Sequence, residues 1–152
     1  MVTRVIRTEA DVDGLHRLLM ARKMPVTVEV TDGESKTTQQ NRLQRQWCND
    51  AAAQLGDRTP EDVRAYSKLH FGVPIMRAAS DAYCDAYDRL IRPLPYETKL
   101  TLMAVPFDFA VTRAMKIKQM TAYLDAMAAH WSGLGVRLTD PEMQKYQQEM
   151  KR

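Results

Sequence analysis

Cations, amides and hydroxyls gather in one stretch of the chain where a long helix is expected to begin. The sequence KTTQQNR starts at Lys36 and is followed by Arg45, and no acidic residue occurs between Glu34 and Asp50. The first turn of a helix normally attracts carboxylates, because its free N–H groups and the helix dipole make it positive. Cations there raise the free energy of the fold unless an anion binds. We therefore interpret the stretch as a phosphate-binding helix start, and a solvated polar face that lacks acids is the alternative.

A second stretch repeats this pattern near the C-terminal end of the chain. The sequence TRAMKIK contains Arg113, Lys116 and Lys118, and no acid occurs between Asp108 and Asp125. A polynucleotide backbone is an anionic track that two such clusters could border, with an affinity that falls as salt rises. The candidate nucleic-acid contacts are Lys36, Thr38, Gln40, Asn41, Arg42, Arg45, Arg113, Lys116 and Lys118.

Three aspartates offer a different chemistry. Asp81, Asp85 and Asp88 fall on one face of an expected helix, as the metal-binding carboxylates of a nuclease would. However, Arg89 and Arg92 lie four residues after the second and third aspartates. This spacing favours a salt-bridged face exposed to solvent.

No other residues have the spacing of a catalytic, metal or cofactor site. The three histidines are scattered without a second ligand at metal spacing, and the chain has neither a glycine-rich phosphate loop nor a GxSxG motif. Two distant cysteines, Cys48 and Cys84, argue against a disulfide framework and a zinc knuckle. We therefore expect a protein that is not an enzyme, holds no metal or cofactor, and works in the reducing cytoplasm.

Length and composition limit the class of protein. The chain has 152 residues, of which 45% are hydrophobic and 27% charged, as in a single soluble globular domain. It lacks the run of about 18 apolar residues that a membrane span requires, and its N-terminus does not resemble a signal peptide. The net charge of +3 makes it only mildly basic, so the clustering of charge matters more than its total.

The first half of the chain is expected to combine two short strands with three helices. Alternating β-branched residues predict strands at Val2–Arg7 and Val26–Val30, on either side of a helix at Glu9–Arg22. Further helices are predicted at Thr38–Leu55 and from Pro60 to about Phe71. The strand–helix–strand order predicts a small sheet, so we expect an α+β fold, a helix-dominated single domain.

The second half is expected to be mainly helical around one long connection. Helices are predicted at Ile75–Ile91 and Lys116–Ser132. The segment Leu94–Phe109 contains three prolines and is predicted to be mostly loop, with a strand at Leu100–Val105.

A short polar helix is predicted at the C-terminal end. It carries Met143, Tyr146 and Met150 at spacings of three and four residues, a narrow apolar stripe suited to docking on a subunit or partner. The domain organisation predicted is therefore residues 1–139 as one α+β domain and 140–152 as this helix. A homodimer interface built from the last helices is compatible with the same stripe.

Three segments together resemble the NinB (Orf) family of phage recombination proteins: KTTQQNRLQRQW, TPEDVRAYSKLHFG and VTRAMKIKQMTAYLDAMAAHWSGLGVRLTDP. Their order and spacing carry the resemblance, which spans nearly the whole chain and is best over Val26–Phe71 and Val111–Pro141. The segment Leu94–Phe109 matches nothing in the family pattern. In the family pattern, Gln40, Asn41 and Arg42 correspond to the signature helix start, and Arg113 with Lys116 lies near the second one.

The resemblance implies a phage or prophage recombination mediator. Members of the family form homodimers, bind single-stranded DNA without strong sequence preference, and act with the host single-strand-binding protein to help load a recombinase. Two alternatives stay open at the level of sequence. One is a metal-dependent nuclease that uses the three aspartates, and the other is a protein-interaction adaptor whose basic patches bind an acidic partner tail.

Overall fold

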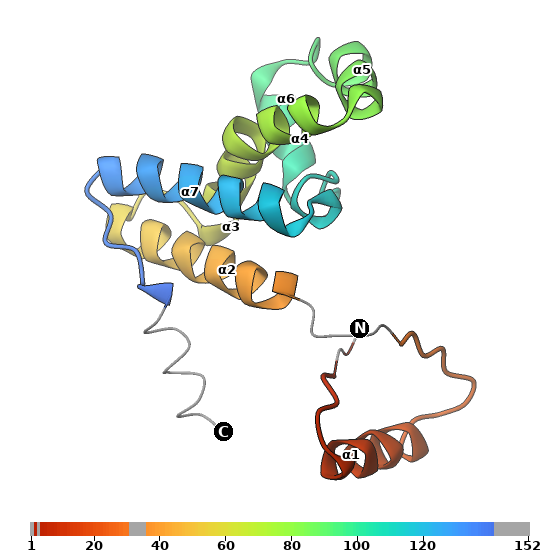
Figure 1. Ribbon diagram of the computed structural model, residues 1–152. Helices are drawn as coiled ribbons and strands as arrows, with labels where there is room; N and C mark the ends of the chain where they lie inside the picture. The colour runs from red at the N-terminus through yellow and green to blue at the C-terminus, as the bar shows by residue number, and fades with distance from the viewer. Residues whose placement is uncertain (1, 3, 31–35, 142–152) are drawn as a thin grey trace. The chain divides into compact units, whose positions relative to one another are not determined.

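A computed structural model of the protein describes residue 2 and residues 4–30 and 36–141, with the backbone alone for 36–38. The chain divides into two compact units, Met1–Ser35 and Lys36–Arg152. Helices are the only regular elements in the described parts of both units (Figure 1).

The N-terminal unit contains one helix, α1 (Glu9–Met20). Its start has a reciprocal cap: the Thr8 hydroxyl accepts a hydrogen bond from the Asp11 amide, and the Asp11 carboxylate accepts one from the Thr8 amide, both at 3.2 Å. The helix predicted here is confirmed, although it ends two residues earlier than expected. No residue of α1 is buried.

The two strands predicted in this unit are absent, so the prediction of an α+β fold with a small sheet is wrong for the described residues. Residues 4–7 and 25–30 run without helix, turn or bend, and neither segment pairs with the other. Alternating β-branched residues favour an extended backbone, but a strand also needs a hydrogen-bonding neighbour. The described residues of this unit supply no such neighbour.

The second unit begins with α2 (Lys36–Leu55) and α3 (Pro60–Ser67). The first ends as predicted, at Gly56, which has a positive φ of 76°. The second starts with the predicted cap, in which the Thr59 hydroxyl accepts from the Asp62 amide at 3.1 Å. Local capping chemistry therefore sets these boundaries.

The helix that begins at Pro60 does not stop near Gly72, which corrects the sequence prediction. It continues through a π-helical turn, η1 (Lys68–Gly72), into α4 (Val73–Ala79), and Gly72 itself is helical. A Cβ atom on Gly72 would collide with Cγ1 of Val111. The glycine therefore allows a close crossing of two segments and does not end the helix.

The helix predicted over Ile75–Ile91 is broken in two. Ser80 adopts an extended conformation (φ −143°, ψ 117°) and caps α5 (Asp81–Leu90), because its hydroxyl accepts a hydrogen bond from the Tyr83 amide at 3.2 Å. A serine that offers the backbone a cap competes with continuation of the helix.

The connection after α5 is more regular than expected. The prediction of loop with a strand at Leu100–Val105 is wrong, since α6 (Tyr96–Met103) begins directly after Pro95. A 3₁₀ turn, η2 (Thr112–Ala114), then leads into α7 (Ile117–Gly133), which lies within one residue of its predicted bounds. The predicted C-terminal helix lies outside the described residues.

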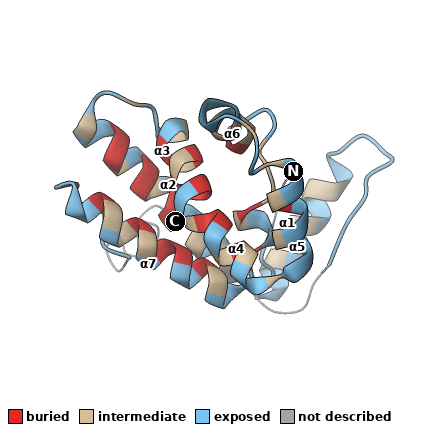
Figure 2. Cartoon of the chain, turned by 90° about the horizontal axis from the view of Figure 1, so that it is seen from above, coloured by how far each residue is buried: buried red, intermediate tan, exposed pale blue. Residues whose placement is uncertain are grey.

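The core of this unit lies between α2, α3 and α7, where buried residues concentrate in Figure 2. Trp131 is fully buried, and its indole N–H donates to the Ser67 hydroxyl at 3.1 Å. Trp47 is buried on α2, and its indole N–H donates to the Thr139 carbonyl at 2.8 Å. The buried face of α7 is formed by Met120, Tyr123, Leu124, Met127 and Trp131.

Candidate nucleic-acid interface

The helices α2 and α7 run side by side in the same direction. The Gln40 side-chain amide donates to the Ile117 carbonyl at 3.3 Å and to the Thr121 hydroxyl at 3.1 Å, at the start of both helices. Further along α2, Gln54 exchanges two 2.7 Å hydrogen bonds with the backbone of Arg137, just beyond the end of α7. The two helix starts therefore lie at the same end of the unit (Figure 1).

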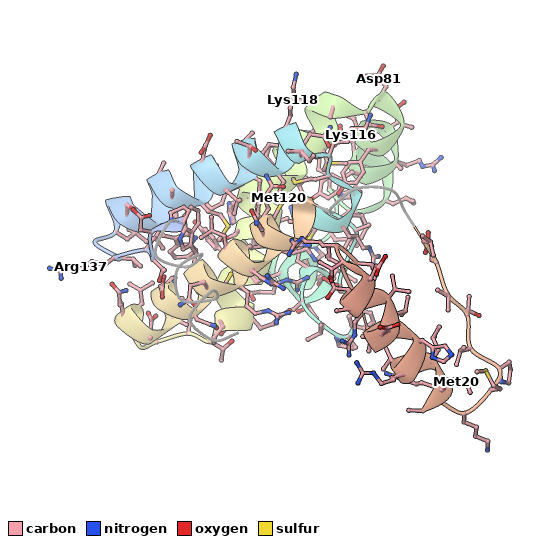
Figure 3. All side chains as sticks on the ribbon, turned by 60° about the horizontal axis from the view of Figure 1, so that its bottom comes forward. Met20, Asp81, Lys116, Lys118, Met120 and Arg137 are labelled. Atoms are coloured by element: carbon pink, nitrogen blue, oxygen red, sulfur yellow. The ribbon has the colours of Figure 1, made fainter. Side chains whose placement is uncertain are left out.

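This arrangement brings together the two cation-bearing helix starts singled out in the sequence. Lys116 and Lys118 stand at the start of α7, and Arg137 lies at the opposite end (Figure 3). Both lysines are exposed, as are Arg45 and Arg113. These four side chains form no salt bridge with a carboxylate in the described part of the chain.

The remaining predicted contacts have different environments. Asn41 and Arg42 are exposed on α2, whereas Gln40 uses its amide N–H groups to bind α7. Lys36 and Thr38 belong to the first turn of α2, and their side chains lie outside the described atoms. Gln40 therefore positions the two helix starts relative to each other, and Arg45, Arg113, Lys116 and Lys118 are the cations available to an anion.

The charge at these two helix starts differs from that of most other helices. The first turns of α1, α3, α5 and α6 each contain at least one acidic residue, and those of α2 and α7 contain none. The first turn of α4 also lacks an acid, but this helix continues directly from η1. At α7 a neutral amide takes the usual acidic role, since the Lys116 amide donates to the Gln119 side-chain oxygen at 2.7 Å. Cap geometry is kept while the positive helix end stays without a carboxylate.

A cleft opens beside the helix starts, with a volume of about 470 Å³. Arg45 and Asn41 from α2 and Arg113 from η2 line it, which unites predicted residues from both clusters. Sequence reasoning missed its other polar lining groups. The spacing of Asn41, Arg45 and Asn49 at every fourth residue could have revealed one of them, because such residues share a helix face. The full lining is Asn41, Gln44, Arg45, Cys48, Asn49, Pro60, Glu61, Arg64, Val105, Thr112 and Arg113.

An ion-pair network supports one wall of the cleft. Arg64 pairs with Glu61 at 2.9 Å and with Asp108, and Lys68 donates to Asp108 at 2.7 Å and to the Met103 carbonyl at 2.7 Å. Asp108 has a positive φ of 47°, which is uncommon outside glycine. The network fixes the chain after α6 against α3.

The same network sets the charge balance of the cleft. Burial acts to raise the pKa of the Asp108 carboxyl, but hydrogen bonds from Lys68 and Arg64 outweigh it, so its pKa is lowered. Burial lowers the pKa of the Lys68 ammonium, and the hydrogen bond to Asp108 opposes that change. The negative charges of Glu61 and Asp108 are balanced by Arg64 and Lys68. The positive charges of Arg45 and Arg113 therefore remain to attract an anion.

The thiol in the cleft is unsuited to nucleophilic chemistry. Cys48 is buried, and the loss of hydration raises the pKa of its thiol to about 12. A thiol with such a pKa is almost wholly protonated at neutral pH, whereas nucleophilic cysteines react as thiolates. The groups lining the cleft are therefore better suited to binding than to covalent catalysis.

The three aspartates considered for a nuclease do not act as one site. Asp88 is held by Arg77 through two hydrogen bonds of 2.8 Å and lies 3.7 Å from Arg92, while Asp81 and Asp85 are exposed. No group of three histidine, cysteine or acidic residues within the described chain could hold a metal ion. The predicted pair of Asp88 with Arg92 is present, whereas no salt bridge joins Asp85 to Arg89 among the described residues, and Arg77 is the main partner of Asp88.

Comparisons of the chain with models of known protein families, with curated proteins and with solved structures found no match. The resemblance to the NinB family therefore stays a prediction. None of the helices in the described part of the chain combines the length and the apolar character needed to cross a membrane.

Proposed function

We propose that this protein binds single-stranded DNA through the surface formed by the starts of α2 and α7 and the cleft beside them. In this proposal Arg45, Arg113, Lys116 and Lys118 neutralise phosphates. Asn41 and the other polar side chains that line the cleft donate hydrogen bonds to the sugar-phosphate backbone of the DNA. Such contacts recognise phosphate and sugar, so they give little sequence preference.

One observation carries the proposal: the parallel packing of α2 and α7, held by Gln40, places two acid-free, cation-bearing helix starts at the same end of the unit. Either helix start alone could be explained as a polar surface exposed to solvent, without any ligand. Two together provide positive charge over a length that a flexible polyanion can follow.

The wider role follows from the NinB-like sequence features and is part of the same proposal. The protein acts as a phage or prophage recombination mediator in the cytoplasm, without catalytic activity of its own. It works as a homodimer and cooperates with the host single-strand-binding protein during recombinase loading.

The proposal is tested by the double variant Arg45→Ala/Arg113→Ala in fluorescence anisotropy with a labelled oligothymidylate. Removing two phosphate contacts should weaken binding at least about tenfold and reduce the steepness of log affinity against log salt by about 1.4. The loss should be similar for oligonucleotides of different sequence, because phosphates carry no sequence information.

The matched control is Arg89→Ala/Arg137→Ala, which removes two exposed arginines away from this surface. It should leave affinity and salt slope unchanged. Equal loss in both double variants would mean that total charge and not this surface governs binding. Displacement of the DNA by an acidic peptide at equal charge concentration would favour the adaptor function instead.

A further inference from the structure

The loop that follows α6 exposes an aromatic ring. Phe107 is 62% exposed and Val105, two residues earlier, is 63% exposed, so the second unit leaves most of both side chains uncovered. The other two phenylalanines of the chain, Phe71 and Phe109, are partly buried against the core. Phe107 is therefore the phenylalanine whose presence core packing does not explain.

Contacts on both sides of Phe107 hold this loop in place. The Val105 amide donates a hydrogen bond to the Glu61 carboxylate at 3.0 Å. The Asp108 carboxylate accepts one from the buried Lys68 ammonium at 2.7 Å. The exposed ring of Phe107 therefore belongs to an ordered loop, and a ligand that contacts it does not have to order the backbone first.

The loop belongs to the wall of the cleft. Val105 lines the cleft together with Arg45 of α2 and Arg113 of η2, and both arginines are exposed. Two residues of chain span at most about 7 Å, so the Cα atom of Phe107 lies within that distance of the Cα atom of Val105. An exposed aromatic ring and two exposed cations thus occur at one cleft.

A ligand that suits this combination carries negative charge and flat apolar surfaces. Single-stranded DNA has both, because its phosphates are charged and its unpaired bases can present their faces to an aromatic side chain. A duplex keeps those faces inside its base stack and presents phosphates and groove edges. A protein partner is less suitable, since a stable interface buries about 800 Å² on each side, far more than the exposed apolar side chains of one short loop supply.

We propose that Phe107 stacks on a base of the strand whose phosphates the cleft binds, and that this contact selects single strands over duplex DNA. The inference rests on the proposed function and adds a contact that the cations cannot supply, because phosphates are present in both forms of DNA. One stacked base increases affinity about fivefold or more.

The test compares Phe107→Ala with the wild-type chain on two labelled strands of equal length, an oligothymidylate and a strand made only of stable abasic sites. Fluorescence anisotropy should show at least about a fivefold loss of affinity for the oligothymidylate and less than about a twofold change for the abasic strand. The salt dependence and the affinity for a duplex should stay the same, because the substitution removes no charge. Phe107→Trp, which keeps an aromatic face, should bind the oligothymidylate as the wild-type chain does.

The matched control is Tyr96→Ala, which removes an exposed aromatic ring from α6, a helix that contributes no residue to the cleft. Its affinity for both strands should equal that of the wild-type chain. Urea unfolding of Phe107→Ala should also match the wild-type chain, because an exposed ring contributes little to packing. A clear loss of stability would mean that other parts of the protein cover the ring, and it would overturn the inference.

Phe107→Trp also gives a direct signal of stacking. Trp47 and Trp131 are buried, so the change in emission on binding should come mainly from the indole at position 107. This emission should be quenched by the oligothymidylate and not by the abasic strand. Equal quenching by both strands would overturn the inference.

The outcomes separate this inference from the proposed function. Binding that depends on Arg45 and Arg113 but not on Phe107 would overturn the inference and leave the proposed function intact. An equal loss in Phe107→Ala on both strands would do the same, because the ring would then act through the shape of the cleft. A wild-type chain that does not bind the oligothymidylate would overturn both.

Discussion

At the residue scale, Lys68 is the one charged side chain that is buried among the described residues, with 1% of its side chain exposed. Such a group is tolerated only with a counter-charge and hydrogen bonds, which Asp108 and the Met103 carbonyl provide. The sequence offered no signal for this pair, because its members lie 40 residues apart. It is a tertiary contact that local patterns cannot encode.

We expect Asp108→Ala to lower the free energy of unfolding by about 3 kcal/mol, because it leaves the Lys68 ammonium buried without its counter-charge. Urea unfolding followed by circular dichroism measures this loss. Asp125→Ala, at an exposed aspartate of α7, is the control and should change stability by less than about 0.5 kcal/mol. A similar small effect at Asp108 would show that Lys68 is hydrated.

Two histidines give the fold a pH dependence. His70 and His130 both stack on Tyr66, with ring centroids 4.1 and 5.3 Å away. Burial lowers the pKa of His70, and the charges of His130 and Lys99 lower it further; burial and Arg58 lower the pKa of His130. The unfolded chain therefore takes up protons more readily, and stability falls as pH drops below about 6.5.

Urea unfolding at pH 7.5 and pH 5 checks this expectation. The midpoint should fall at the lower pH in the wild-type chain and change less in His70→Phe/His130→Phe, which keeps the aromatic stack but removes both titrating groups. His16→Gln, at an exposed position of α1, should retain the wild-type dependence. An unchanged pH dependence in the double variant would assign the effect to other groups.

At the scale of elements, the sequence predicted best those boundaries that local chemistry decides. The Thr59 cap and the positive-φ Gly56 mark the ends of helices in sequence and in structure alike. It predicted worst those that depend on distant neighbours. Gly72 has the residue type of a helix end, but it allows a close crossing with Val111 instead. The valines at 26–30 have a strand pattern, but no strand pairs with them among the described residues of their unit.

For the candidate site too, the local features could be predicted from sequence and the contacts between distant segments could not. The exposed cations of both clusters could be named from spacing and from the missing acids. That the two helix starts lie at the same end of the unit depends on the direction of α2 relative to α7, which Gln40 fixes through a contact across 77 residues. Arg64 lines the cleft and pairs with Asp108, which is 44 residues away in the sequence. Its local sequence does not distinguish it from an ordinary surface arginine, so its place in the cleft could not be predicted.

Gly72→Ala tests whether the glycine is there for the crossing. Alanine normally stabilises a helix relative to glycine by about 1 kcal/mol, yet here we expect a net loss of about 1 to 3 kcal/mol from the collision with Val111. Adding Val111→Ala should recover part of the loss, as a double-mutant cycle in urea would measure. Gly14→Ala on α1 has open space around its Cβ and should be neutral or stabilising.

At the scale of the whole molecule, the proposed function predicts that the acid-free helix starts favour binding at the expense of stability. A carboxylate at the third helical position of α7 would complete a charged cap, worth about 0.3 to 1 kcal/mol. The chain has Gln119 there and accepts a cap without charge. A carboxylate at this position would also lie beside Lys116 and Lys118 and repel phosphate.

Gln119→Glu therefore should move stability and binding in opposite directions. We expect its unfolding free energy to rise by up to about 1 kcal/mol and its affinity for oligothymidylate to fall several-fold at low salt, with the difference shrinking as salt screens the charge. Thr98→Glu adds the same charge at the third position of α6, a helix that contributes no residue to the cleft, and should leave affinity unchanged. A rise in stability without any loss of affinity would show that the start of α7 is not part of the binding surface. A new carboxylate beside a bound phosphate would have to weaken binding.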